Sequence, residues 1–142
     1  MTALPDEAHG ALGVGWATVE LDRAARELAH LLVPGSAFAD APSSVLLGAR
    51  CRVGPAADDA VLQIVLLEPD SEGPLAATLA RGGEGWAATW ILTSPVSPRM
   101  ADPGRSGALS TPRPGPFGPE RLLLGGRRPA PHRLIVDVPS HP

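Results

Sequence analysis

The sequence contains no lysine, no tyrosine and no asparagine, and Cys51 is its only cysteine. Without these three residue types, a lysine Schiff base, a phenolic general acid and an oxyanion hole lined by asparagine are excluded. A single cysteine forms no internal disulfide and cannot build a cysteine-based zinc site. Any chemistry therefore depends on carboxylates, four histidines, arginines, serines and Cys51.

Long apolar runs and a strong charge of either sign are also missing. The chain carries 15 acidic and 12 basic side chains, for a net charge of −3, which gives no basic surface of the kind that nucleic acid requires. No apolar run approaches the roughly 18 residues of a membrane span, and the first residues lack the pattern of a signal peptide. We therefore expect a cytoplasmic protein with no nucleic-acid or membrane partner. Basic charge carried only by arginine, together with 16 glycines and 17 prolines, suggests a bacterial origin.

Length and composition favour one domain. A chain of 142 residues with 44% hydrophobic content buries one core and leaves little room for a second. We therefore expect a single domain over residues 1–142. Its less regular parts are an N-terminal tail (1–12), a proline- and glycine-rich loop (95–118) and a C-terminal tail (139–142).

The order of apolar patterns predicts a chain of mixed α and β structure. A helix is predicted over 20–32, where leucine and alanine recur at three- and four-residue steps. It follows a predicted strand, and strands, a short helix and a closing hairpin come after it. The predicted strands are 13–19, 43–53, 60–69 and the segment around Trp86 and Trp90; the short helix is 72–85, and 120–126 and 132–138 form the hairpin.

Three segments of the chain resemble one known superfamily. They are GVGWATVELDRA (13–24), VLLEPDSEGPLAATLARGGEGWAATW (65–90) and ERLLLGGRRPAPHRLIVDV (120–138). Their order and content resemble the vicinal-oxygen-chelate superfamily, and the second segment is similar to its methylmalonyl-CoA epimerase and glyoxalase-like branch. The resemblance implies an α+β fold in which βαβββ modules form a curved mixed sheet. That sheet is a cup with one or two helices outside, and the second module here lacks a clear helix.

The resemblance also implies where a metal would bind. In the superfamily, four strand positions facing the cup carry the metal ligands, and they fall here on Gly13, Val65, Ala88 and Val136. None of these side chains offers an oxygen, nitrogen or thiolate donor to a divalent ion. We therefore expect no metal and no cofactor.

Alternation along the strands predicts what lines the cup instead. Side chains two residues apart share a face of a strand, so Trp86, Ala88 and Trp90 are predicted to face the cup together. Two indoles in an apolar pocket suit an aromatic or acyl small molecule. The alternative is that the indoles are core and fill the cup themselves. The predicted ligand-binding residues are Gly13, Gln63, Val65, Trp86, Ala88, Trp90 and Val136.

Three functions remain open at this point. The first is a metal-independent small-molecule binding protein, similar to bleomycin-resistance proteins. The second is a metal-free biosynthetic enzyme on the same cup, such as a cyclase, an isomerase or a lyase-like enzyme, with His132 or Asp137 as its acid-base group. The third is a structural relative that uses its strands to pair with a partner chain. The missing second helix would leave one side of the sheet uncovered, which predicts a homodimer or a proline-rich cover.

Overall fold

One curved sheet of eight strands and two α-helices make up the part of the chain that the structure describes. The computed structural model describes residues 2–8, 10–59, 61–93, 109–124 and 131–137. The helices are α1 (Leu21–Glu27) and α2 (Pro74–Gly82), with 3₁₀ turns η1 (Asp6–Ala8) and η2 (Ala29–Leu31). The strands are β1 (Gly13–Ala17), β2 (Ala39–Ser44), β3 (Ala49–Pro55), β4 (Gln63–Pro69), β5 (Gly85–Thr93), β6 (Arg113–Gly115), β7 (Gly118–Leu122) and β8 (His132–Asp137).

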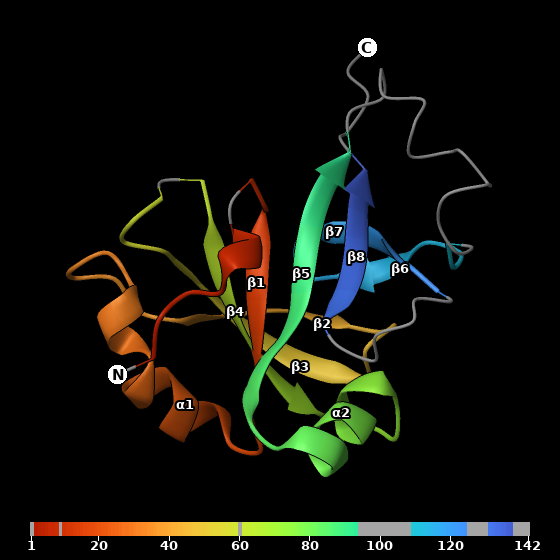
Figure 1. Cartoon of the computed structure of the whole chain (residues 1–142), viewed down its shortest axis with the longest axis horizontal. Helices are drawn as coiled ribbons and strands as arrows, with labels where there is room; N and C mark the ends of the chain where they lie inside the picture. The colour runs from red at the N-terminus through yellow and green to blue at the C-terminus, as the bar shows by residue number, and fades with distance from the viewer. Residues whose placement is uncertain (1, 9, 60, 94–108, 125–130, 138–142) are drawn as a thin grey trace.

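The strands form two related halves that meet at the centre of the sheet (Figure 1). The strand order is β2-β3-β4-β1-β5-β8-β7-β6. In each half the first strand runs parallel to the last, β1 to β4 and β5 to β8, and antiparallel pairing of β1 with β5 joins the halves. With α1 after β1, the first half is a βαβββ module. The fold is the predicted α+β cup; of the segment 95–118, where the resemblance would place the second module's helix, residues 95–108 lie outside the described residues.

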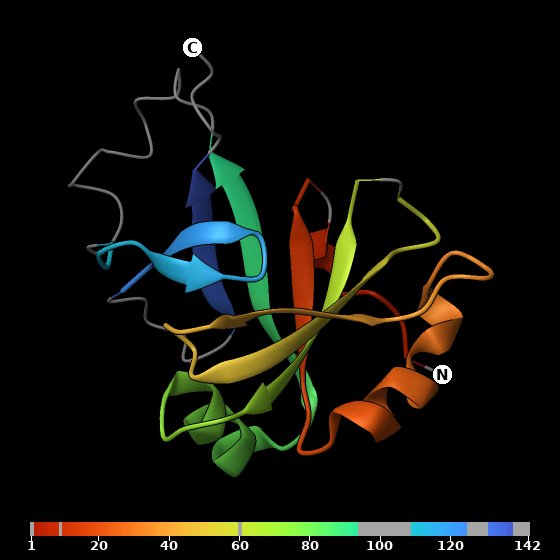
Figure 2. The ribbon, with the colours of Figure 1, turned by 180° about the vertical axis from the view of Figure 1, so that it is seen from behind.

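Curvature brings the two ends of the sheet together (Figure 2). β2 and β6 are the outermost strands, yet the backbone N–H of Val45, just after β2, donates to the carbonyl of Pro114 on β6 at 3.2 Å. The sheet is therefore nearly closed into a barrel. Closure leaves little unpaired strand edge, and such edges are where other chains add by strand pairing.

The inner face of the sheet holds the largest hydrophobic cluster. Leu67 from β4, Trp90 from β5 and Leu134 from β8 have no exposed surface and pack together there. Helix α2 closes one end of the cup, because Leu75 is fully buried in this cluster and Leu79 packs against it. Pro74 begins this helix, and Gly83, with φ of +77°, ends it. These are the residues that favour a helix start and a helix stop.

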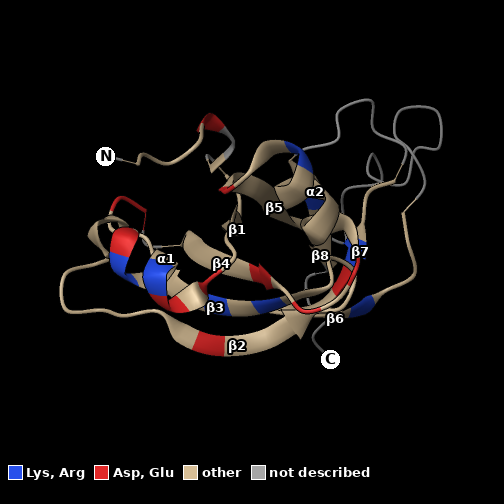
Figure 3. Cartoon of the chain, turned by 90° about the horizontal axis from the view of Figure 1, so that it is seen from below, with Lys and Arg blue, Asp and Glu red and all other residues tan. Residues whose placement is uncertain are grey.

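Helix α1 covers part of the outer face. Its apolar stripe places Leu21, Ala24 and Leu28 against Leu66 of β4. No side chain of its own caps its N-terminus; instead the Glu68 carboxylate on β4 accepts the backbone N–H of Leu21 at 3.0 Å. Charged residues lie on α1, β2 and β3 (Figure 3), and Arg52 of β3 forms ion pairs with Asp22 of α1 and Asp40 of β2. Neither described helix is long and apolar enough to cross a membrane.

Two predictions of local structure were wrong. The single strand predicted over 43–53 is the end of β2 and the start of β3, joined by a tight turn in which Gly48 has φ of +70°. The turn was missed because it contains Leu47, an apolar residue typical of a strand. Leu47 is apolar there because its side chain is fully buried. The predicted loop over 95–118 contains β6 and the start of β7. β6 is the last strand in the order of the sheet, where proline, which has no backbone N–H to donate, is tolerated. The carbonyl of Pro114 accepts the N–H of Val45.

Candidate functional site

Six of the seven predicted ligand-binding residues lie on the inner face of the cup. Val65, Ala88, Trp90 and Val136 belong to the inner cluster. Gln63 lies two residues before Val65 on β4. Gly13 of the neighbouring strand β1 pairs with Gln63. Gln63 is half-buried. These residues therefore form one continuous wall made by β4, β1, β5 and β8.

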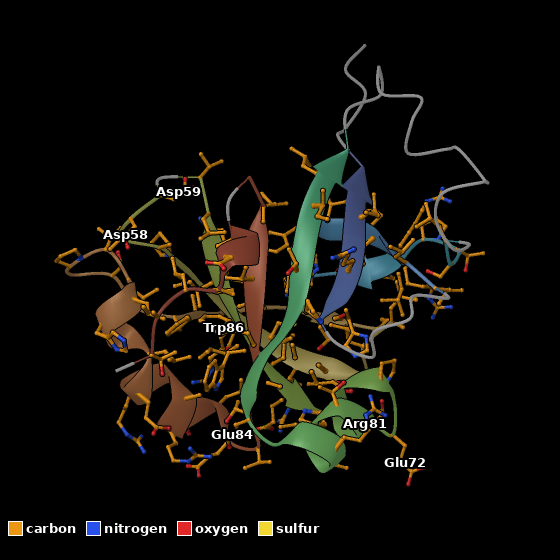
Figure 4. The ribbon with its side chains drawn as sticks, in the orientation of Figure 1. Asp58, Asp59, Glu72, Arg81, Glu84 and Trp86 are labelled. Carbon is orange, nitrogen blue, oxygen red and sulfur yellow. The ribbon has the colours of Figure 1, made fainter. Side chains whose placement is uncertain are left out.

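The predicted shared face of Trp86 and Trp90 was wrong. The β1–β5 register pairs Gly15 with Ala88 but Trp16 with Trp86, so Ala87 has no opposite residue. This bulge turns Trp86 to the outer face. There its ring packs edge to face on Trp16, with centroids 5.2 Å apart, and its indole N–H donates to the carbonyl of Ala3 at 2.9 Å. Figure 4 shows Trp86 on the side of β5 that faces α1.

A different aromatic residue accompanies Trp90 inside the cup. Phe117, in the turn between β6 and β7, lies edge to face with Trp90 at a centroid distance of 5.7 Å. A β-carbon built on Gly13 would lie 2.7 Å from the Phe117 ring, and one built on Gly15 would lie 2.8 Å from the Trp90 ring. The two glycines are therefore what allows two aromatic rings to approach β1 this closely.

The cup also contains a fully buried carboxyl group that sequence reasoning missed. Glu120 of β7 has no exposed surface. Its Oε1 accepts the indole N–H of Trp90 at 2.8 Å, and its Oε2 accepts the hydroxyl proton of Ser44 at 2.8 Å. Burial raises the pKa of Glu120, and the hydrogen bonds from Trp90 and Ser44 lower it by less. Glu120 thus links β7 to β5 and β2 across the interior.

A signal for Glu120 was present in the sequence. Leu122 faces the core, so alternation places Glu120 on the same face two residues earlier. Glu120 stands at the start of the predicted hairpin, and its side chain was given no role in the prediction. The buried position of Glu120 also requires a glycine at position 115 on the neighbouring strand β6. A β-carbon on Gly115 would lie 1.9 Å from Glu120 Oε1.

His132 lies at the end of the cup that α2 closes. It pairs with Ala88 across β8 and β5, and its Nε2 is 2.8 Å from the hydroxyl of Thr78 on α2. That hydroxyl donates its single proton to the carbonyl of Pro74, so Nε2 carries a proton and donates to Thr78. Burial is the main cause that lowers the pKa of His132, and the positive charge of Arg81 adds to it. The side chain of Asp137, the other predicted acid-base candidate, lies outside the described residues.

We expect NMR titration of the folded protein to give His132 a pKa below its ordinary value of 6.5. The same resonance in urea-unfolded protein is the control, because unfolding removes both the burial and the charge of Arg81. A folded-state pKa at or above the unfolded one would contradict the buried, neutral imidazole.

The donor set does not fit a divalent metal. The residues at the four positions implied by the resemblance have hydrogen or alkyl side chains, and three of them are buried in the inner cluster. Across the described residues there is no group of three or more His, Cys, Asp or Glu side chains that could hold a metal ion. Glu120 is the carboxylate nearest in register to Val136, and both of its oxygens already accept hydrogen bonds.

A separate cavity of about 250 Å³ opens on the outer side of the molecule. The N-terminal segment and the turn between β3 and β4 form its walls, and Figure 4 marks two of its aspartates, Asp58 and Asp59. None of the predicted site residues lines it. The lining residues are Leu4, Pro5, Asp6, Ala8, Asp58, Asp59 and Leu62.

Comparison with solved structures finds the same architecture elsewhere. Methylmalonyl-CoA epimerase from Mycobacterium tuberculosis superposes with a TM-score of 0.70 at 21% identity, covering 98% of this chain and 94% of that one. The Streptomyces coelicolor epimerase, in complex with 2-nitronate-propionyl-CoA, gives 0.67 at 20% identity over 92% and 97%. A hypothetical protein from Bacillus halodurans gives 0.67 at 18% identity over 93% and 96%. No protein-family model and no curated protein matches the sequence. The chain therefore has the fold of methylmalonyl-CoA epimerases and related vicinal-oxygen-chelate proteins.

Proposed function

We propose that this chain is a metal-independent small-molecule binding protein that takes an aromatic or acyl ligand into its cup. The observation that carries the proposal is the aromatic wall over β1, where Phe117 and Trp90 lie on Gly13 and Gly15. An apolar, concave surface with a few polar groups is the usual form of a small-molecule site. Gln63 is the half-buried polar side chain of this one, and the Trp90 N–H and Glu120 are bonded to each other below the surface.

The exposure of the inner-face residues indicates which end of the cup admits a ligand. At the α2 end Leu47, Leu67 and Leu75 are fully buried. At the opposite end Leu92 is 49% exposed, and Gln63 and Phe117 are half-buried. A ligand would therefore enter between the start of β4, the end of β5 and the turn joining β6 to β7.

Acyl ligands are included in the proposal because a solved structure of the same fold binds one. The Streptomyces coelicolor epimerase of the same fold holds 2-nitronate-propionyl-CoA. This chain lacks the metal ligands that the superfamily resemblance would require at Gly13, Val65, Ala88 and Val136. Binding without metal-assisted chemistry is the function that the remaining residues support best.

A metal-free enzyme is the second candidate, and Glu120 favours it. A buried carboxyl group with a raised pKa is a usual form of general acid. His132 supports this candidate less, because its Nε2 is engaged by Thr78 at the closed end of the cup. Turnover would require a ligand that reaches Glu120 past Phe117.

Tryptophan fluorescence tests the binding proposal, because Trp90 lies inside the cup and Trp16 and Trp86 lie outside it. A Trp16→Phe, Trp86→Phe double variant leaves Trp90 as the single reporter. We expect saturable changes in its emission on titration of the metal-stripped protein with aromatic metabolites or acyl-thioesters. The contact of an aromatic ligand with the Trp90 indole contributes roughly 0.5–1.5 kcal/mol.

The matched control is Trp90→Phe, which keeps only the outer pair as reporters. Its emission should not respond to the same ligands. A response in the control with none in the double variant would place binding outside the cup. No response from Trp90 to any compound of either class would overturn the proposal.

A further inference from the structure

We propose that Phe117 occupies the subsite for an aromatic ring of the ligand, so that the ligand is an uncharged molecule with a single six-membered aromatic ring that displaces Phe117. This inference rests on the proposed binding function and names the ligand class for it. The ring of Phe117 is the one aromatic group among the described cup residues that comes from a turn rather than from a strand.

The contacts of Phe117 are those that a bound ring would make. Its edge-to-face angle with Trp90 is 69°, a preferred geometry of aromatic pairs. Its ring tip presses on the bare backbone of Gly13, where a β-carbon would lie 2.7 Å away. A side chain at position 13 would therefore occupy the space that the edge of this ring fills.

Phe117 differs from Trp90 in how firmly it is held. Trp90 has no exposed surface and its N–H is fixed by Glu120 at 2.8 Å. Phe117 is half-buried, has no polar anchor and is followed by Gly118, which has φ of +114°. Rotation of the Phe117 side chain or a change at Gly118 would free the subsite without breaking the hydrogen bonds of Glu120.

The inner face also sets the charge of the ligand. The polar side chains around the subsite are Gln63 and, beneath Trp90, the carboxyl group of Glu120 with its Ser44 partner. None of these is basic, and burying an unpaired charge is costly. An uncharged ring with a hydroxyl or carbonyl substituent, within reach of Gln63, fits this lining.

The test compares benzyl alcohol with cyclohexylmethanol, which has the same carbon skeleton but a puckered, saturated ring. Trp90 is the reporter, in the background that lacks Trp16 and Trp86. The variants are Phe117→Ala and Phe117→Leu, and the matched control is Phe38→Leu, since Phe38 is the other phenylalanine and packs on the outer face. Near-ultraviolet circular dichroism verifies the fold of each variant. If Phe117→Ala does not fold, the affinity of Phe117→Leu for the two probes decides the test.

We expect benzyl alcohol to bind the Phe117 variants about tenfold more tightly than the parent, because the parent must first expel its own ring. Phe38→Leu should bind as the parent does, and cyclohexylmethanol should bind every protein more weakly than benzyl alcohol. Equal affinity of parent and Phe117 variants for benzyl alcohol, or equal affinity of the variants for both probes, would overturn the inference.

The same titrations separate this inference from the binding proposal. If acyl-thioesters change the emission of Trp90 while benzyl alcohol binds no better after Phe117 is replaced, the cup binds ligands and the aromatic subsite is wrong. If neither the two probes nor any acyl-thioester changes the emission of Trp90, both are wrong.

Discussion

Glu120→Ala is expected to lower the free energy of unfolding by about 3–5 kcal/mol. The substitution leaves the indole N–H of Trp90 and the hydroxyl of Ser44 without their buried acceptor, and each such loss costs roughly 1–3 kcal/mol. It also leaves a cavity in the cup, which adds to the loss. Urea denaturation followed by far-ultraviolet circular dichroism measures the change.

Glu120→Gln is the matched control, because the amide keeps an acceptor and nearly the same volume. We expect it to lose less than about 1 kcal/mol at pH 4. A loss as large as that of Glu120→Ala would contradict the hydrogen-bonding role. A loss below 1 kcal/mol for Glu120→Ala would show that the three-residue link does not stabilise the fold.

The pH dependence of the same pair follows from the raised pKa of Glu120. In the unfolded chain the Glu120 carboxyl group has its ordinary pKa of 4.5. Above that pH the folded protein still holds the proton that the unfolded chain has lost. The stabilisation from neutral Glu120 is thus complete below 4.5 and is lost as the pH rises through the folded-state pKa. We expect the stability of the parent to fall relative to Glu120→Gln over this window. His132, whose shift has the opposite sign, is common to both proteins and cancels in the difference.

Gly115→Ala is expected to destabilise the protein by about 2–4 kcal/mol. The new β-carbon would lie 1.9 Å from Oε1 and 2.2 Å from Cδ of Glu120, a carboxyl group that cannot withdraw without breaking its bonds to Trp90 and Ser44. Overpacking and the loss of a buried hydrogen bond both contribute. The midpoint of urea unfolding reports the effect.

Gly82→Ala supplies the control for this substitution. Gly82 lies at the end of α2, and a β-carbon there would meet nothing within 4 Å. We expect a gain of roughly 0.5–1 kcal/mol, because alanine favours a helix over glycine. Gly115→Ala with a similar gain would mean that Glu120 does not occupy the space beside β6.

The order of the fold was predictable from the sequence because its signals are local. The apolar run of β4 and the stripe of α1 give their positions directly, and the superfamily resemblance gives the cup. The turn at Gly48 was missed because the buried Leu47 within it imitates a strand. Helix α1 begins on a carboxylate from β4, a contact between residues far apart in the sequence that no local pattern contains.

The contents of the cup were less predictable, and particular residues explain why. Strict alternation predicted Trp86 and Trp90 on one face of the strand. Ala87 has no opposite residue on β1, and this extra residue turns Trp86 to the other face. Phe117 was overlooked because it lies in a turn, and only the closure of the sheet carries that turn to Gly13. Glu120 was given no role, although its alternation with Leu122 places it inside.

The position of β1 at the centre of the sheet has a consequence for how the chain is made. β1 comes first among the strands, but it pairs only with β4 and β5, which follow much later. During synthesis it has no strand to join until those segments emerge, and the buried face of Val14 stays exposed in the meantime. Pairings between distant segments form slowly and leave such surfaces open to aggregation. One side of β1 is therefore covered by β4 of its own module, but the other side stays open until β5, the first strand of the second module, has emerged.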